Sequence, residues 1–108
     1  MNRKKDQNDI ILQYAGWIIK KDAYGYIFHH VNDRKMNHAK YPSTLAGALE
    51  LLHEEILLNK RLSNGYDGSI KAFRNAIIET HKEFEQLLSP KILDMIKEEQ
   101  GGERFERN

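Results

Sequence analysis

The fold is decided by the stretch Trp17-Ile18-Ile19-Lys20-Lys21-Asp22-Ala23-Tyr24-Gly25-Tyr26-Ile27-Phe28-His29-His30-Val31. It is rich in β-branched and aromatic side chains, a composition typical of strands. Its polar interruption begins with Asp22 and ends with Gly25, which favours a short turn. We therefore predict a β-hairpin with strands at about residues 17–21 and 26–31. A helix must cover one face of so small a sheet, so Trp17, Ile19 and Phe28 are expected to be core, whereas Tyr24 is the aromatic side chain that packing explains least.

The residues before this hairpin divide into two parts. Residues 1–9 are polar after Met1 and carry no periodicity, so we expect a flexible arm. Residues 10–14 are more apolar, and Ala15-Gly16 separates them from Trp17. They fit either a further strand or a short helical turn, and the sequence leaves both open.

The residues after the hairpin predict a surface loop and then a helix. Residues 32–40 are polar and favour a loop, after which Tyr41 is expected to start a short strand or bridge. Pro42 favours extended backbone at Tyr41, and Ser43 or Thr44 can cap a helix. One continuous helical face follows, widened by three further leucines; the face is Leu45, Ala48, Leu49, Leu52 and Ile56, and the leucines are Leu51, Leu58 and Leu62.

Two more helices are predicted towards the C-terminus. The first should bury a stripe on one side, comprising Ile70, Phe73, Ile77, Phe84 and Leu88, with Thr80 or His81 filling the gap. The second should begin at Ser89-Pro90 with a stripe of Ile92, Leu93 and Ile96, and end at Gly101-Gly102. The expected fold is α+β: a small antiparallel sheet of two or three strands packed on two long helices plus a short C-terminal helix. Residues 10–100 form one domain, and residues 101–108 form a flexible tail.

Composition excludes several classes of protein. The chain has 108 residues, a formal net charge of +1 and no cysteine. It therefore has no disulfide framework, cysteine zinc site or thiol nucleophile. No apolar run is long enough to span a membrane, and no secretion signal is recognisable at the N-terminus, so we expect a cytoplasmic protein.

The five histidines and the serines do not form a recognisable catalytic or metal site. His29 and His30 are neighbours on a predicted strand, so they point to opposite faces. His53 and His81 lack a second ligand at the spacing of a helical zinc motif. Capping and turns already explain the serines. We therefore expect a non-catalytic protein with no cofactor and no bound metal.

Charge is distributed unevenly along the chain. Residues 20–40 carry a net charge of +3, whereas residues 63–108 carry −2. A basic hairpin and loop with an exposed aromatic ring could bind a nucleic-acid backbone and stack on bases. The candidate partner-binding residues are Lys20, Lys21, Tyr24, Arg34, Lys35 and Lys40.

The order of elements adds a resemblance. A hairpin followed by Tyr41-Pro42-Ser43-Thr44-Leu45-Ala46-Gly47-Ala48-Leu49 at the start of a helix is similar to small uncharacterised proteins of phages and prophages, over about residues 14–93. The resemblance implies a mobile-element accessory protein of unknown activity, with no catalytic residues to carry over. Together with the small size and the lack of a catalytic constellation, it leads us to expect stoichiometric binding of a protein, and by analogy an anti-CRISPR-like inhibitor of a host defence nuclease. Nucleic-acid binding through the basic hairpin is the alternative. The broad apolar face that includes Leu51, Leu58 and Leu62 leaves room for a homodimer.

Overall fold

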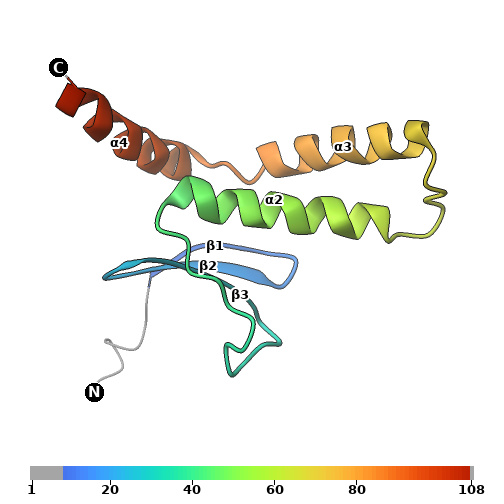
Figure 1. Ribbon diagram of the computed structural model, residues 1–108, viewed down its shortest axis with the longest axis horizontal. Helices are drawn as coiled ribbons and strands as arrows, with labels where there is room; N and C mark the ends of the chain where they lie inside the picture. Colours follow the sequence, from blue (N-terminus) through green and yellow to red (C-terminus); the bar gives the residue numbers. More distant parts are fainter. Residues whose placement is uncertain (1–8, 108) are drawn as a thin grey trace.

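The computed structural model describes residues 9–107, in which three strands precede three helices (Figure 1). The elements are β1 (Asp9–Tyr14), β2 (Trp17–Asp22), β3 (Gly25–His30), α2 (Leu45–Arg61), α3 (Ile70–Glu85) and α4 (Pro90–Arg107). The predicted α+β class is confirmed. Residues 1–8 of the predicted arm and Asn108 lie outside the described residues, and Asp9 already belongs to β1.

The sheet is an antiparallel meander in the order β1-β2-β3. Residues 10–14, which the sequence left open, form a strand. Ala15 and Gly16 have φ of 53° and 88°, the left-handed pair that a two-residue hairpin turn requires. At the second turn the Asp22 carboxylate accepts hydrogen bonds from the backbone N–H groups of Tyr24 and Gly25, at 2.8 and 3.0 Å. This confirms the hairpin predicted between residues 17 and 31.

A single bridge extends the sheet beyond β3. It joins Phe28 to Lys40, so the bridge expected at Tyr41 lies one residue earlier. The N–H of Tyr26 also donates to the carbonyl oxygen of Pro42 at 3.0 Å. Residues 40–42 thereby cover part of the outer edge of β3, which would otherwise expose unpaired backbone groups.

Helix α2 covers one face of the sheet. Its buried residues are the predicted ones, namely Leu45, Ala48, Leu49, Leu52 and Ile56. They pack against Ile19 and Phe28, which are 1% and 3% exposed. Thr44 caps the helix by accepting the N–H of Gly47 at 3.0 Å, which satisfies one of the free donors of the first turn.

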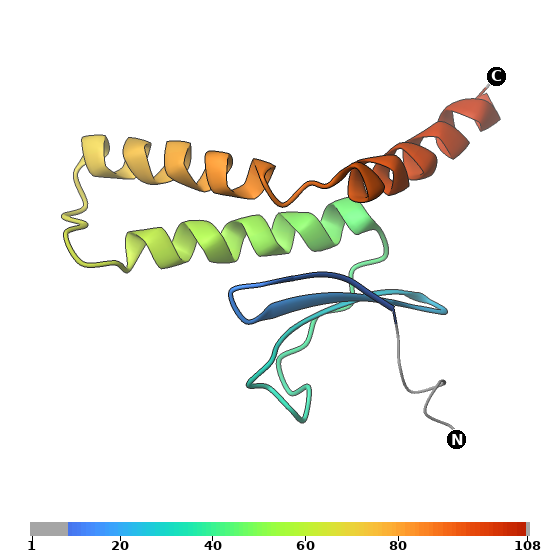
Figure 2. The same cartoon turned by 180° about the vertical axis from the view of Figure 1, so that it is seen from behind.

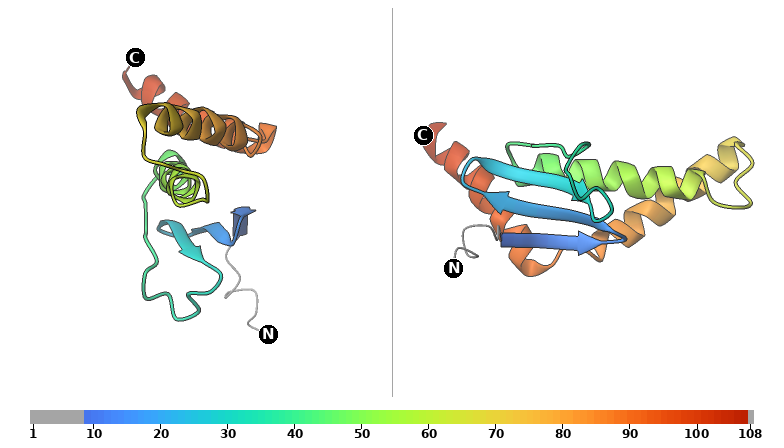
Figure 3. Two further views of the ribbon diagram at one scale, coloured as in Figure 1. Left: turned by 90° about the vertical axis from the view of Figure 1, so that its right-hand side faces the viewer. Right: turned by 90° about the horizontal axis from the view of Figure 1, so that it is seen from below.

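The helices form two layers above the sheet. Helix α2 lies directly on the sheet, and α3 lies on the opposite side of α2 (Figure 2 and Figure 3, left). Helix α2 makes the main helical contact with the sheet, and α3 reaches it through the hydrogen bond between Tyr14 and Glu83. One side of α2 therefore packs on the sheet, and another side packs on α3.

Thr80 is buried and Phe84 packs against the core, as the predicted stripe requires, but the N-terminal part of that stripe is exposed on helix α3. Its buried side chains are Ala76 and Thr80, while Ile70, Phe73 and Ile77 are 87%, 39% and 41% exposed. The prediction of a buried stripe through these three residues is wrong. The reason is that small side chains let α3 approach α2 closely, so the larger ones lie beside the contact rather than in it.

Helix α4 is longer than predicted. It continues to Arg107 through Gly101-Gly102, so the predicted stop at this pair is wrong. Glycine costs about 1 kcal/mol in a helix relative to alanine, which weakens a helix without ending it. No helix within residues 9–107 combines the length and the apolar character needed to cross a membrane.

Glu99 of α4 links three elements. Its Oε2 atom accepts hydrogen bonds from the Tyr26 hydroxyl of β3 at 3.3 Å and from the N–H of Leu45 at 3.1 Å. A carboxylate at this position complements the positive end of α2. Burial and the Glu99 carboxylate raise the pKa of Tyr26, which keeps its hydroxyl a donor.

Thr80 provides a test of the contact between α2 and α3. The residue is fully buried, and its hydroxyl has no hydrogen-bond partner among the described residues. Thr80→Val keeps the shape and removes an unsatisfied polar group, so it should raise the free energy of unfolding by about 1 kcal/mol in chemical denaturation. Thr80→Ala should lower it, because the lost methyl group leaves a cavity. Destabilisation by valine would show that the hydroxyl is bonded.

Candidate functional site

The six predicted partner-binding residues do not form one cluster. Lys20 and Lys21 point to opposite faces of β2, and the Lys21 Nζ atom lies 5.0 Å from the centroid of the Tyr26 ring. Tyr24 occupies the turn at one end of the β2–β3 pair and is 94% exposed. Arg34 and Lys35 are exposed in the loop that leaves the other end of β3, whereas Lys40 forms the bridge to Phe28.

The loop that carries Arg34 and Lys35 is organised by Asp33. The Asp33 carboxylate accepts the backbone N–H groups of Asn37 and His38, at 3.0 and 2.8 Å. The hydrogen bond from His38 is the main reason that the pKa of Asp33 is lowered. This loop lies on the side of the sheet away from α2 (Figure 3, left).

A concave site lies where α2 extends past the sheet. A helix of 17 residues is about 25 Å long, whereas a strand of six residues spans about 20 Å. The C-terminal end of α2 therefore projects beyond the β1–β2 turn (Figure 1). We call the hollow below it the corner; its walls are Tyr14, Ala15, Trp17, His30, Glu55, Leu58, Asn59, Lys60, Leu62 and Glu83.

Two cavities meet in this region. The corner encloses about 290 Å³, and a second, more open cavity of about 480 Å³ lies between the end of the sheet and the Asp33 loop. Trp17 and His30 line both cavities. The corner lies just below, and the second cavity within, the range of roughly 300–1,000 Å³ that is typical of ligand sites.

Trp17 and His30 form a rigid wall between the two cavities. The Trp17 ring stacks on Phe28 with centroids 4.8 Å apart, and the His30 ring meets Trp17 edge-on at 4.8 Å. The Nδ1 atom of His30 accepts the N–H of Asn32 at 3.1 Å. A Cβ atom on Gly16 would lie 2.5 Å from the Nε2 atom of His30, so the turn needs glycine for space as well as for its φ. The prediction that Trp17 is core is correct for its contact with Phe28, although the residue stays half-buried.

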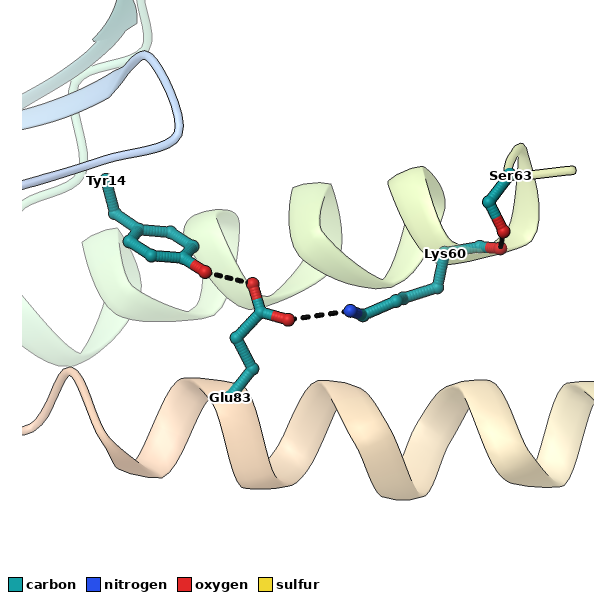
Figure 4. Close-up of polar contacts among 4 residues, drawn as sticks. All are labelled: Tyr14, Lys60, Ser63 and Glu83. Atoms are coloured by element: carbon teal, nitrogen blue, oxygen red, sulfur yellow. Dashed lines mark hydrogen bonds and ion pairs between the residues drawn. The ribbon is translucent and has the colours of Figure 1, made fainter.

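The polar wall of the corner is a chain of three side chains from three elements (Figure 4). The Tyr14 hydroxyl of β1 donates to Oε2 of Glu83 on α3, and the Lys60 Nζ atom of α2 lies 2.7 Å from Oε1. The hydrogen bonds from Lys60 and then from Tyr14 lower the pKa of Glu83, and the bond to Glu83 raises the pKa of Tyr14. Both carboxylate oxygens are engaged, which favours a structural role over proton transfer.

Glu55 is the remaining carboxylate of the corner. It is half-buried and forms no ion pair within the part of the chain that the structure describes. Leu58 and Leu62, one helical turn apart, are 44% and 74% exposed beside it. The corner thus combines an aromatic ring, two accessible leucines and one unneutralised negative charge, which suits a ligand with an apolar part and a cationic group.

Sequence reasoning did not find the corner. The sequence predicts Leu58 and Leu62 only as part of a broad apolar face, and no motif singles out Glu55 or Glu83. Tyr14 and Glu83 are 69 residues apart, so no local pattern connects them. Among residues 9–107, no three histidine, aspartate or glutamate side chains converge in an arrangement that could hold a metal ion.

Comparisons with protein-family models, with curated proteins and with solved structures found no match to this chain. The resemblance to phage and prophage accessory proteins therefore stays a prediction.

The Glu83 contacts predict a dependence of stability on pH. Because the folded-state pKa of Glu83 is lowered, its contribution is present above its unfolded pKa of about 4.3 and is lost as pH falls through the folded value. Glu83→Gln should cost about 1 kcal/mol of unfolding free energy at neutral pH, and this difference should shrink towards pH 3. Denaturant melts across this range measure it. The control Glu79→Gln, at an exposed position one turn earlier, should leave the decrease of unfolding free energy at acidic pH unchanged. If the unfolding free energy of Glu83→Gln ran parallel to that of wild type over the whole pH range, the stabilising role of the Glu83 carboxylate would be contradicted.

Proposed function

We propose that this chain is a non-catalytic binding protein that holds a segment of a partner protein in the corner. The observation that carries the proposal is the pairing of exposed Leu58 and Leu62 with the half-buried Trp17 around one hollow. Single exposed leucines are common on protein surfaces, but two that wall a cavity beside a tryptophan form a typical anchor pocket.

The chemistry of the corner defines the kind of partner. An aliphatic or aromatic side chain of the partner fits against Leu58, Leu62 and Trp17, and a neighbouring lysine or arginine would neutralise Glu55. A non-catalytic role is supported by Glu83, whose two oxygens are already occupied by Lys60 and Tyr14. A basic, partly apolar protein segment is therefore the occupant that we propose.

A sharper form of the proposal identifies the partner as a CRISPR-type defence nuclease. Its support is the resemblance of residues 14–93 to phage and prophage proteins, some of which block such nucleases. Nucleases that hold nucleic acid carry basic grooves. A lysine or arginine from such a groove would provide the cationic partner for the Glu55 carboxylate. This role implies action in the cytoplasm of the host cell, which is consistent with a chain without cysteine.

The test is a titration of purified CRISPR effector nucleases with this chain, followed by DNA cleavage and pull-down. Wild type should inhibit a susceptible nuclease at a near-equimolar ratio. Leu58→Glu should weaken binding by at least about tenfold, because it places a charge in the apolar wall. Leu93→Glu is the matched control, since Leu93 on α4 is also 44% exposed. Equal binding by both variants would exclude the corner, and binding of DNA without binding of any nuclease would contradict the proposal.

Nucleic-acid binding is the second candidate, and the exposure of Tyr24 favours it. The Tyr24 ring packs on nothing that would explain an aromatic residue in the turn, and it is available to stack on a base. A gel shift with single-stranded DNA should then weaken steeply as salt rises. Tyr24→Ala should reduce binding, as should Arg34→Ala with Lys35→Ala, whereas Lys71→Ala on α3 should not. Salt-independent binding, or no shift at low salt, would reject this candidate.

A further inference from the structure

An apolar track runs along one side of α3. Ile70, Ile77 and Phe84 are seven residues apart, a spacing that advances only about 20° around a helix per step. Ile70 is 87% and Ile77 is 41% exposed, and Phe73 beside them is 39% exposed. Phe73 and Phe84 of this track contact α2 within one copy, through Arg61 and His53, whereas Ile70 and Ile77 are left exposed.

A row of α2 residues lies beside this track. His53, Leu57 and Arg61 are four residues apart and so follow one another along the helix. The His53 ring meets the Phe84 ring edge-on with centroids 5.0 Å apart, and the Arg61 guanidinium lies 5.6 Å from the centroid of the Phe73 ring. The two rows therefore form one surface on the helical hairpin of α2 and α3, which we call the hairpin face.

The hairpin face is charged at its two ends with opposite signs. At the α4 end, Glu50 and Glu54 line an apolar groove of about 390 Å³ together with Phe84. At the other end lie Arg61 and Arg74, of which Arg74 is three residues before Ile77 and so is its neighbour on the helix surface. Leu57 and Ile77 occupy the middle. The face is thus acidic at one end, apolar in the centre and basic at the other.

We propose that two copies of this chain associate through the hairpin face, related by a two-fold axis near Ile77. Rotation by half a turn about this axis places the acidic end of one copy on the basic end of the other and apolar centre on apolar centre. A symmetric dimer requires a surface whose two ends are complementary to each other. Binding of an unrelated partner does not require this, because the partner supplies the opposite charges.

The size of the face sets the strength of the dimer. Two helices about 24 Å long and about 10 Å wide present roughly 500 Å² per copy, or roughly 1,000 Å² in total, which lies at the lower bound for a specific interface. A reversible dimer is therefore expected.

The first test compares two adjacent isoleucines by sedimentation and light scattering, from sub-micromolar to several hundred micromolar protein. Wild type should change from monomer to dimer over this range. Ile77→Glu should remain monomeric, because it places two carboxylates together near the axis. Ile78→Glu should dimerise like wild type, since Ile78 is 43% exposed but lies about 100° further around α3. Both positions are exposed, so both variants should unfold at similar denaturant concentrations.

The second test uses charge reversal. Glu50→Lys with Glu54→Lys makes both ends of the face basic, and Arg61→Glu with Arg74→Glu makes both ends acidic, so each double variant alone should be monomeric. An equal mixture should form heterodimers, because the two faces are then complementary. A wild-type monomer at every concentration, dimers that survive Ile77→Glu, or a mixture that associates no better than its components would each overturn the proposal.

Discussion

The structure depends on the burial of one helix, α2, on two sides. Leu45 and Leu52 are at most 1% exposed because the sheet covers them from one side, while α3 packs on another side of the same helix. A three-stranded sheet and a helical hairpin each need a partner for their apolar face, and α2 serves both. Full burial of each leucine contributes about 2 kcal/mol, so loss of this layer would leave neither part stable.

Polar contacts then fix the outer helices relative to the sheet. Glu83 of α3 reaches the Tyr14 hydroxyl, and Glu99 of α4 reaches the Tyr26 hydroxyl. Each carboxylate also binds α2, through Lys60 at its C-terminal end and through the N–H of Leu45 at its N-terminal end. Apolar packing alone would let the layers slide, whereas these directional bonds at both ends of α2 define one arrangement.

The parts of the fold that follow local rules could be predicted from the sequence. The spacing of Leu45, Leu52 and Ile56 identified the buried face of α2, and the turn at Asp22 followed from the hydrogen bonds that its side chain makes to nearby backbone. The corner could not be predicted, because it depends on how far α2 projects past β1. The six basic and aromatic candidates were identified by charge, but charge along the chain does not determine which side chains share a surface.

The exposed N-terminal part of the stripe on α3 shows that the spacing of apolar residues does not by itself establish burial. Periodicity shows that Ile70, Phe73 and Ile77 share a side of the helix, but it does not show what covers that side. Within one copy the α2–α3 contact buries Ala76 and Thr80, and Ile70 and Ile77 remain exposed. This row of exposed apolar side chains is the basis for the dimer that we propose.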